Sequence, residues 1–167
     1  MAAGATYTPI ATTTLGSDQA SVTFSSISGT YTDLVLVCSI QQSGTDDFSI
    51  RFNGDTGSNY SRTTLWGDGT SGGSYRSSNA TQITVSYYGY PPSAASTFGT
   101  EIINIQNYSN TTTYKTVVAR ANNAGTGTDA TVGLWRSTSA ITEVLVRINA
   151  GNLKSGSTFT LYGIASA

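Results

Sequence analysis

Hydrophobic residues alternate with polar ones along much of the chain, in short runs that clusters of Gly, Asn, Asp and Ser separate. The runs 83–87 and 144–148 both have a hydrophobic residue at every second position. A period of two places alternate side chains on opposite faces of a strand, so one face is buried and the other is wet. No segment shows a 3.6-residue period. The pattern therefore predicts about ten strands, with the spacing typical of a sandwich or barrel.

One run is apolar throughout and stands apart from the alternating ones. Residues 34–38 read Leu-Val-Leu-Val-Cys, and a continuous apolar run of this length predicts a strand buried on both faces. We therefore expect the segment 31–40 to lie at the centre of the core. The expected fold is all-β: an antiparallel two-sheet β-sandwich, jelly-roll-like, with about ten strands.

The length of 167 residues is that of one domain, and no linker-like segment divides the chain. We expect an extended N-terminal arm over residues 1–9 and a single β-sandwich domain over residues 10–167. Tyr7 and Pro9 belong to this arm, which would lie on a neighbouring subunit. A frayed terminus is the alternative. The first residues contain neither a basic nor an apolar region, so no secretory signal is expected.

Charge is scarce in this chain. Only 10% of the residues are charged, the net charge is −1, and 51 of the 167 residues are Ser or Thr. A nucleic-acid binder needs a basic surface, and a membrane span needs about 20 apolar residues, so we expect neither partner. A surface rich in uncharged hydroxyl groups instead suits a protein whose many copies pack side by side, because uncharged faces do not repel one another.

The candidates for catalysis are few. The chain has no His, which excludes His-based catalysis and His metal ligation. Cys38 lies in the apolar run, where a buried thiol is inert. Glu101 and Glu143 are the two acids in predicted strands and the candidates for a glycosidase-type carboxylate pair. Lys115 or Lys154 could activate a Ser, but no Ser-x-x-Lys is present. We expect no catalytic residue and no enzyme activity.

Two acidic loops have oxygen ligands for a cation. The loop 53–59, with Asp55 at its centre, alternates oxygen-bearing residues as a Ca²⁺ site does, and Asp46-Asp47 could add to such a site. The closing Glu of the twelve-residue calcium loop is absent. A Gly/Asn turn and a solvated hairpin tip explain these segments more simply, so we expect no metal and no cofactor.

Aromatic residues are the remaining signal. A sugar-stacking face could be formed by Trp66, Tyr87, Tyr88, Tyr90 and Trp135, although core packing explains Tyr87 and Trp135 equally well. The segment 88–93 combines Tyr and Pro in a turn, where core packing is harder to invoke, and Tyr is enriched at interfaces, so this loop is a candidate for contact with a partner. The candidate interface residues are Tyr7, Pro9, Trp66, Tyr88, Tyr90, Pro91 and Pro92.

Five separate segments of the chain carry a resemblance to known proteins. They are FSSISGTYTDLVL (24–36), RFNGDTGSNY (51–60), NYSNTTTYK (107–115), GLWRS (133–137) and GSTFTLYGI (156–164). Together, and in this order, they resemble segments of small virion proteins of tailed bacteriophages, including phages of cyanobacteria. The resemblance runs from about Thr12 to Ile164 and includes no catalytic motif.

This resemblance implies a jelly-roll or related β-sandwich module that serves as a capsid decoration (cement) protein or as part of a tail fibre. The chain has no coiled-coil heptads and no β-helical repeat, which favours decoration. The expected partners are the major capsid protein and other copies of the chain in a homotrimer, on the capsid surface of the virion. The alternative is a tail or fibre module that binds a host-surface glycan through Trp66 and the Tyr88–Tyr90 loop. A depolymerising enzyme with paired carboxylates is a third hypothesis.

Overall fold

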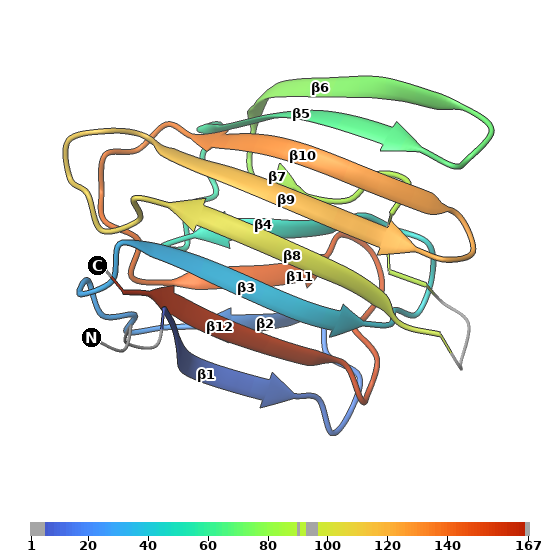
Figure 1. Ribbon diagram of the computed structural model, residues 1–167, viewed down its shortest axis with the longest axis horizontal. Helices are drawn as coiled ribbons and strands as arrows, with labels where there is room; N and C mark the ends of the chain where they lie inside the picture. The colour runs from blue at the N-terminus through green and yellow to red at the C-terminus, as the bar shows by residue number, and fades with distance from the viewer. Residues whose placement is uncertain (1–5, 90, 93–96, 166–167) are drawn as a thin grey trace.

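The computed structural model describes residues 6–89, 91–92 and 97–165, and its strands form two antiparallel sheets (Figure 1). The larger sheet contains, in spatial order, β1 (Tyr7–Thr14), β12 (Thr158–Ile164), β3 (Asp33–Ile40), β8 (Gly99–Gln106), β9 (Lys115–Asn123), β10 (Gly127–Trp135), β5 (Tyr60–Gly67) and β6 (Gly72–Ala80). The smaller sheet contains β2 (Ser21–Phe24), β11 (Val144–Ile148), β4 (Phe48–Phe52) and β7 (Ile83–Thr84). The predicted all-β two-sheet sandwich is confirmed.

The chain passes repeatedly from one sheet to the other. The connections β2–β3, β4–β5, β6–β7 and β10–β11 each join strands of different sheets. Hairpins between neighbouring strands occur only at β5–β6, β8–β9 and β9–β10 within the described residues. Repeated crossing between two antiparallel sheets is the connectivity of a jelly roll.

The core lies between the sheets and uses the alternation seen in the sequence. On β3, Leu34, Leu36 and Cys38 point inward and are buried, as the apolar run predicts. Val35 points to the opposite face and is also buried, whereas Val37 on that face is only half-buried. On the outer face of β3, neighbouring side chains therefore cover Val35 and leave Val37 partly open to solvent.

β6 is the strand that hydrophobicity does not reveal. It lies in the longest stretch of low hydrophobicity in the chain, and most of its nine residues are exposed. Its strand geometry comes from backbone pairing with β5, which runs from Tyr60 to Gly67. An edge strand stabilised by such a ladder needs no buried face, so its sequence lacks the expected alternation. The described residues thus contain twelve strands, two more than predicted.

The described part of the predicted arm belongs to the chain's own sheet. Residues 1–5 lie outside the described residues, and Tyr7–Pro9 begin β1, which pairs with β12 along its length. The Tyr7 ring meets the Tyr162 ring edge-on, with the ring centroids 6.1 Å apart. The predicted boundary at residue 9 therefore falls inside a strand.

Candidate functional site

The outer face of the larger sheet is the broadest open surface of the fold. We use this name for the side chains that point away from the smaller sheet. Val132 and Val118 lie directly opposite each other on β10 and β9, with 57% and 43% of their surface exposed. Leu65 on β5 is 61% exposed. Strand alternation puts these aliphatic side chains outside because the core already occupies the opposite face of each strand.

This outer face carries little charge. The charged residues at its outward strand positions are Asp33, Arg76 and Arg120, and the other positions are mostly Thr, Ser, Asn and aliphatic residues. The face is eight strands wide, and each strand contributes about four outward-pointing residues, so its area is about 700–900 Å². This area matches the roughly 800 Å² that each partner buries in a standard protein interface. Two shallow hollows lie on it, one of about 540 Å³ beside Val132 and one of about 380 Å³ beside Val118.

A second candidate surface is an aromatic cluster, which we define as Trp66, Tyr75, Tyr87 and Tyr88. The Trp66 and Tyr88 rings stack with their centroids 4.2 Å apart, and the Tyr75 and Tyr87 rings stack at 5.3 Å. A Cβ atom on Gly73 would lie 2.9 Å from the Trp66 ring, so that ring packs closely against the glycine. The indole therefore contacts both Tyr88 and Gly73 within the chain, and the most exposed rings of the cluster are Tyr75 and Tyr87, at 43% and 37%.

Asp129 holds the loop that carries two of these rings. It is buried at an inward position of β10, and its carboxylate accepts the backbone N–H groups of Tyr87, Tyr88 and Gly89. A Cβ atom on Gly89 would lie 2.7 Å from the carbonyl oxygen of Ala121, so the loop backbone approaches the sheet closely. Sequence reasoning missed this residue, although an acid at an inward position of an alternating strand is a usable signal.

The predicted interface residues fall into separate places. Tyr7 and Pro9 lie on β1, at one edge of the larger sheet, whereas Trp66 and Tyr88 lie near the other edge. Tyr90 lies outside the described residues. Pro91 and Pro92 are buried, and their carbonyl groups accept hydrogen bonds from Gln42, so these two prolines contact the chain itself. The structure thus joins Trp66 with Tyr88 and separates both from Tyr7.

The two predicted strand acids do not form a pair. Glu101 lies on β8 in the larger sheet, whereas Glu143 precedes β11 in the smaller one. Glu101 is fully buried beside Cys38, and neither of its carboxylate oxygens has a hydrogen-bond partner. Burial, and to a lesser degree the charge of Asp129, raises the pKa of Glu101 well above its usual value. Burial likewise raises the pKa of the Cys38 thiol.

The loop 53–59 is closed by hydrogen bonds to Asp55. The carboxylate accepts the N–H of Gly57 at 2.8 Å, the side-chain amide of Asn59 at 2.9 Å and the indole N–H of Trp135 at 2.7 Å. Desolvation raises the pKa of Asp55, but these three donors outweigh it and lower the pKa. Within the described residues no three His, Cys, Asp or Glu side chains gather as metal ligands would. The described chain also forms no helix that could cross a membrane.

The fold and these surfaces define the chain as a jelly-roll-like β-sandwich with an open sheet face. No family model matches the chain, and no curated protein matches it. Among solved structures it is similar to an exo-inulinase from Aspergillus awamori, with 14% identity over 95% of this chain and a TM-score of 0.47. This chain spans only 29% of the exo-inulinase. It is also similar to the alginate lyase Aly36B, with 12% identity over 92% of this chain and 77% of the lyase, at a TM-score of 0.35. Similarities this slight carry no argument about this chain.

Proposed function

We propose that the chain is a structural protein of a phage virion, a decoration protein that binds between capsomers and stabilises the head shell. The observation that carries this proposal is the outer face of the larger sheet, which exposes Leu65, Val118 and Val132 on a broad surface with little charge. An exposed apolar patch of this kind marks an interaction surface. The five segments that resemble phage virion proteins supply the kind of partner, the major capsid protein.

The proposed mechanism is multivalent clamping of the shell. Burying the aliphatic centre of the outer face removes apolar surface from water, and the low charge of the face keeps the cost of desolvation small. A copy that touches two capsomers binds the second at a raised effective concentration, so weak contacts add. A homotrimer at a three-fold position would repeat this contact by symmetry.

The copy number per particle tests this proposal. Virions of the phage that encodes the chain are purified, and the chain is quantified against the major capsid protein by mass spectrometry. A copy number comparable to that of the capsid protein is the expected result. A few copies per particle would contradict decoration and indicate a tail or fibre position, and absence from the particle would contradict a virion role altogether.

A glycan-binding tail module is the second candidate, and one observation favours it. Tyr75 and Tyr87 are 43% and 37% exposed although their rings stack on each other, and the buried Arg62 guanidinium lies 5.0 Å from the centre of the Tyr75 ring. Exposed tyrosine rings, each with a hydroxyl group that donates and accepts hydrogen bonds, suit contact with a sugar. Adsorption that a free saccharide inhibits, and that Tyr87→Ala abolishes, would support this candidate. Adsorption unaffected by both would reject it.

A further inference from the structure

The larger sheet ends in two edge strands, β1 and β6, and their free edges differ. β1 contains Pro9 and a bulge between Pro9 and Ala11. Proline has no N–H to donate and a bulge bends the strand, so both features discourage pairing with a further strand. β6 contains no Pro, its one charged residue is Arg76, and its register with β5 is regular from Gly72 to Ser77 and shifts only between Ser77 and Ala80. The segment Gly72–Ser77 is therefore a regular edge without a proline or a bulge.

The hairpin shows which backbone groups of β6 are already used. The N–H of Asp68 donates to the carbonyl oxygen of Ser71 across the turn, at 3.0 Å. In an antiparallel pair of strands, residues whose backbone N–H and C=O bond to the partner strand alternate with residues whose N–H and C=O point away from it. Counting from this bond, the residues of β6 that bond to β5 are Gly73, Tyr75 and Ser77.

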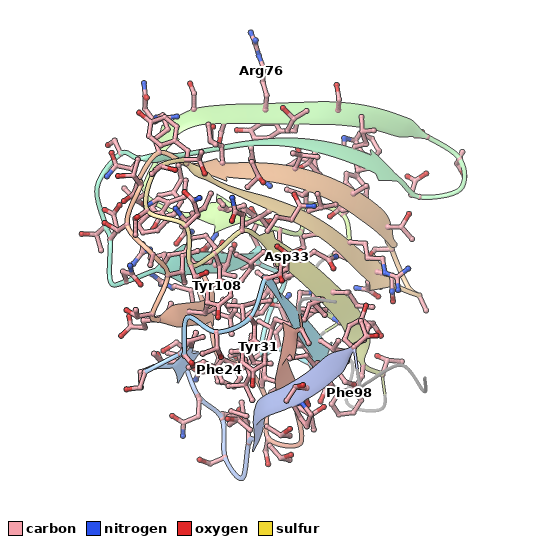
Figure 2. The ribbon with its side chains drawn as sticks, turned by 60° about the vertical axis from the view of Figure 1, so that its left-hand side comes forward. Phe24, Tyr31, Asp33, Arg76, Phe98 and Tyr108 are labelled. Atoms are coloured by element: carbon pink, nitrogen blue, oxygen red, sulfur yellow. The ribbon has the colours of Figure 1, made fainter. Side chains whose placement is uncertain are left out.

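The residues between them present their backbone to the free edge. These are Gly72, Ser74 and Arg76, and each has one N–H and one C=O that point away from β5. The Arg76 side chain is exposed and projects from β6 away from the rest of the molecule (Figure 2). No neighbouring element of the described chain covers this edge.

Exposed aromatic rings lie beside the same edge. Tyr75 points to the inner side of β6, and the smaller sheet does not reach it, because β7 contacts β5 and β10 and the sheet ends there. Tyr75 and Tyr87 consequently remain 43% and 37% exposed. A strand added to β6 would extend the sheet next to these rings and bury part of their apolar surface.

We infer that β6 pairs in antiparallel fashion with β6 of a second copy of this chain, across a two-fold axis at Ser74. In this register Ser74 faces Ser74 of the second copy, and Gly72 faces Arg76. All three edge residues of each copy then form ladder bonds, which gives six bonds in total. Each Arg76 faces a residue without a side chain, so the two guanidinium groups do not meet.

The second copy is the occupant that the two edges favour. A head-to-tail contact of β6 with β1 would need the edge that Pro9 and its bulge obstruct. A two-fold contact uses the open edge on both sides, and it closes, so it does not extend into a filament. This contact uses one edge of the larger sheet and does not involve Leu65, Val118 or Val132, so it leaves the apolar centre of the outer face free and is independent of the proposed function.

The substitution Ser74→Pro tests the pairing directly. It removes an N–H at the free edge and no bond to β5, and Pro is tolerated at the edge of a sheet. The mass of the purified chain in solution, measured by sedimentation equilibrium, should be an even multiple of the 17.4 kDa chain. Ser74→Pro should halve that mass. Ser74→Thr is the matched control, because it keeps the N–H and should keep the wild-type mass.

Two results would overturn the inference. One is a wild-type chain that stays monomeric at every concentration tested, and the other is a folded Ser74→Pro variant whose mass equals that of the wild type. If Ser74→Pro does not fold, amide hydrogen exchange of the wild type decides the question. Protection of the Ser74 and Arg76 amides that rises with protein concentration supports the pairing, and rapid exchange at every concentration overturns it. Both measurements use the purified chain without capsids.

Discussion

The buried carboxylate of Asp129 on β10 accepts the backbone N–H of Gly89 at 2.9 Å. The same carboxylate accepts the N–H groups of the two preceding residues, so one side chain satisfies three consecutive donors of the loop that follows β7. This contact fixes the loop against the larger sheet and, with it, the position of the Tyr87 and Tyr88 rings. The aromatic cluster therefore depends on an acid that is far from it in sequence.

Replacing this acid should loosen the loop. Asp129→Ala leaves three N–H groups without an acceptor at a buried position, and we expect a loss of about 3 kcal/mol of unfolding free energy. Urea denaturation measures the loss, and near-ultraviolet circular dichroism should show weaker aromatic signals. The control is Asp68→Ala, which removes a carboxylate that accepts two N–H groups in an exposed turn. Equal losses for both variants would contradict the anchoring role.

The stability of the chain should fall as the pH rises above the unfolded pKa of Glu101. Burial raises the pKa of Glu101 well above its usual value of 4.5, so the folded state keeps the proton that the unfolded state releases. Stability from this group is complete below the unfolded pKa and is lost as the pH rises toward the folded pKa. Between these two pKa values the slope should approach at most about 1.4 kcal/mol per pH unit.

Substitutions identify the source of this slope. Glu101→Gln should flatten it in urea denaturation series, whereas Glu143→Gln, at a partly exposed position, should leave it unchanged. Burial also raises the pKa of Asp47, to about 6, so Asp47 adds a slope of the same sign that ends near pH 6 and that Glu101→Gln leaves in place. An unchanged slope in Glu101→Gln would show that Glu101 is ionised in the folded state.

Acid should weaken the contact between Asp55 and Trp135. Because the pKa of Asp55 is lowered, the stability it provides is present above the unfolded value of 3.8 and is lost as the pH falls through the folded value. Trp135→Phe removes the indole donor, so it should cost about 1 kcal/mol near neutral pH for the hydrogen bond, with a further loss from the cavity in the core, and move acid unfolding to a higher pH. Trp66→Phe is the control, since that indole stacks on Tyr88 instead. A shift of equal size in Trp66→Phe would contradict the assignment.

A charge on the outer face should block shell binding without unfolding the chain. Val132 is 57% exposed, so Val132→Lys should change the unfolding free energy by less than about 0.5 kcal/mol. It should also lower co-sedimentation with particles that lack the protein, because the lysine must be desolvated at the contact. Thr23→Lys places the same charge on the exposed side of β2 in the smaller sheet and should bind like the wild type. Normal binding of Val132→Lys would exclude this face as the contact.

The strands that the sequence predicts best are those whose alternation reflects burial. In β11, Val144, Val146 and Ile148 follow the period of two and are all buried, because the hydrophobic effect selects one face of a strand against a core. β6 escaped prediction because its backbone pairs with β5 while its side chains stay in water. A hydrophobic pattern cannot reveal a strand whose side chains are not buried.

The candidate surfaces could be predicted only in part. The sequence marked Trp66 and Tyr88 as aromatic candidates, and the structure places them together. It did not indicate that Tyr75 joins them, because the register of β5 with β6 is a long-range property. It also singled out Pro91 and Pro92 for contact, whereas packing against Gln42 and its surroundings buries both.

By itself the sequence determined an all-β sandwich with a core centred on Leu34 and Leu36, because alternation and β-branched residues are local signals of strand formation. Only the tertiary structure decided which apolar side chains remain outside. A period of two separates two faces of a strand but does not say which face another layer will cover. Val118 and Val132 resemble core residues in the sequence, and the position of the smaller sheet leaves them open to water.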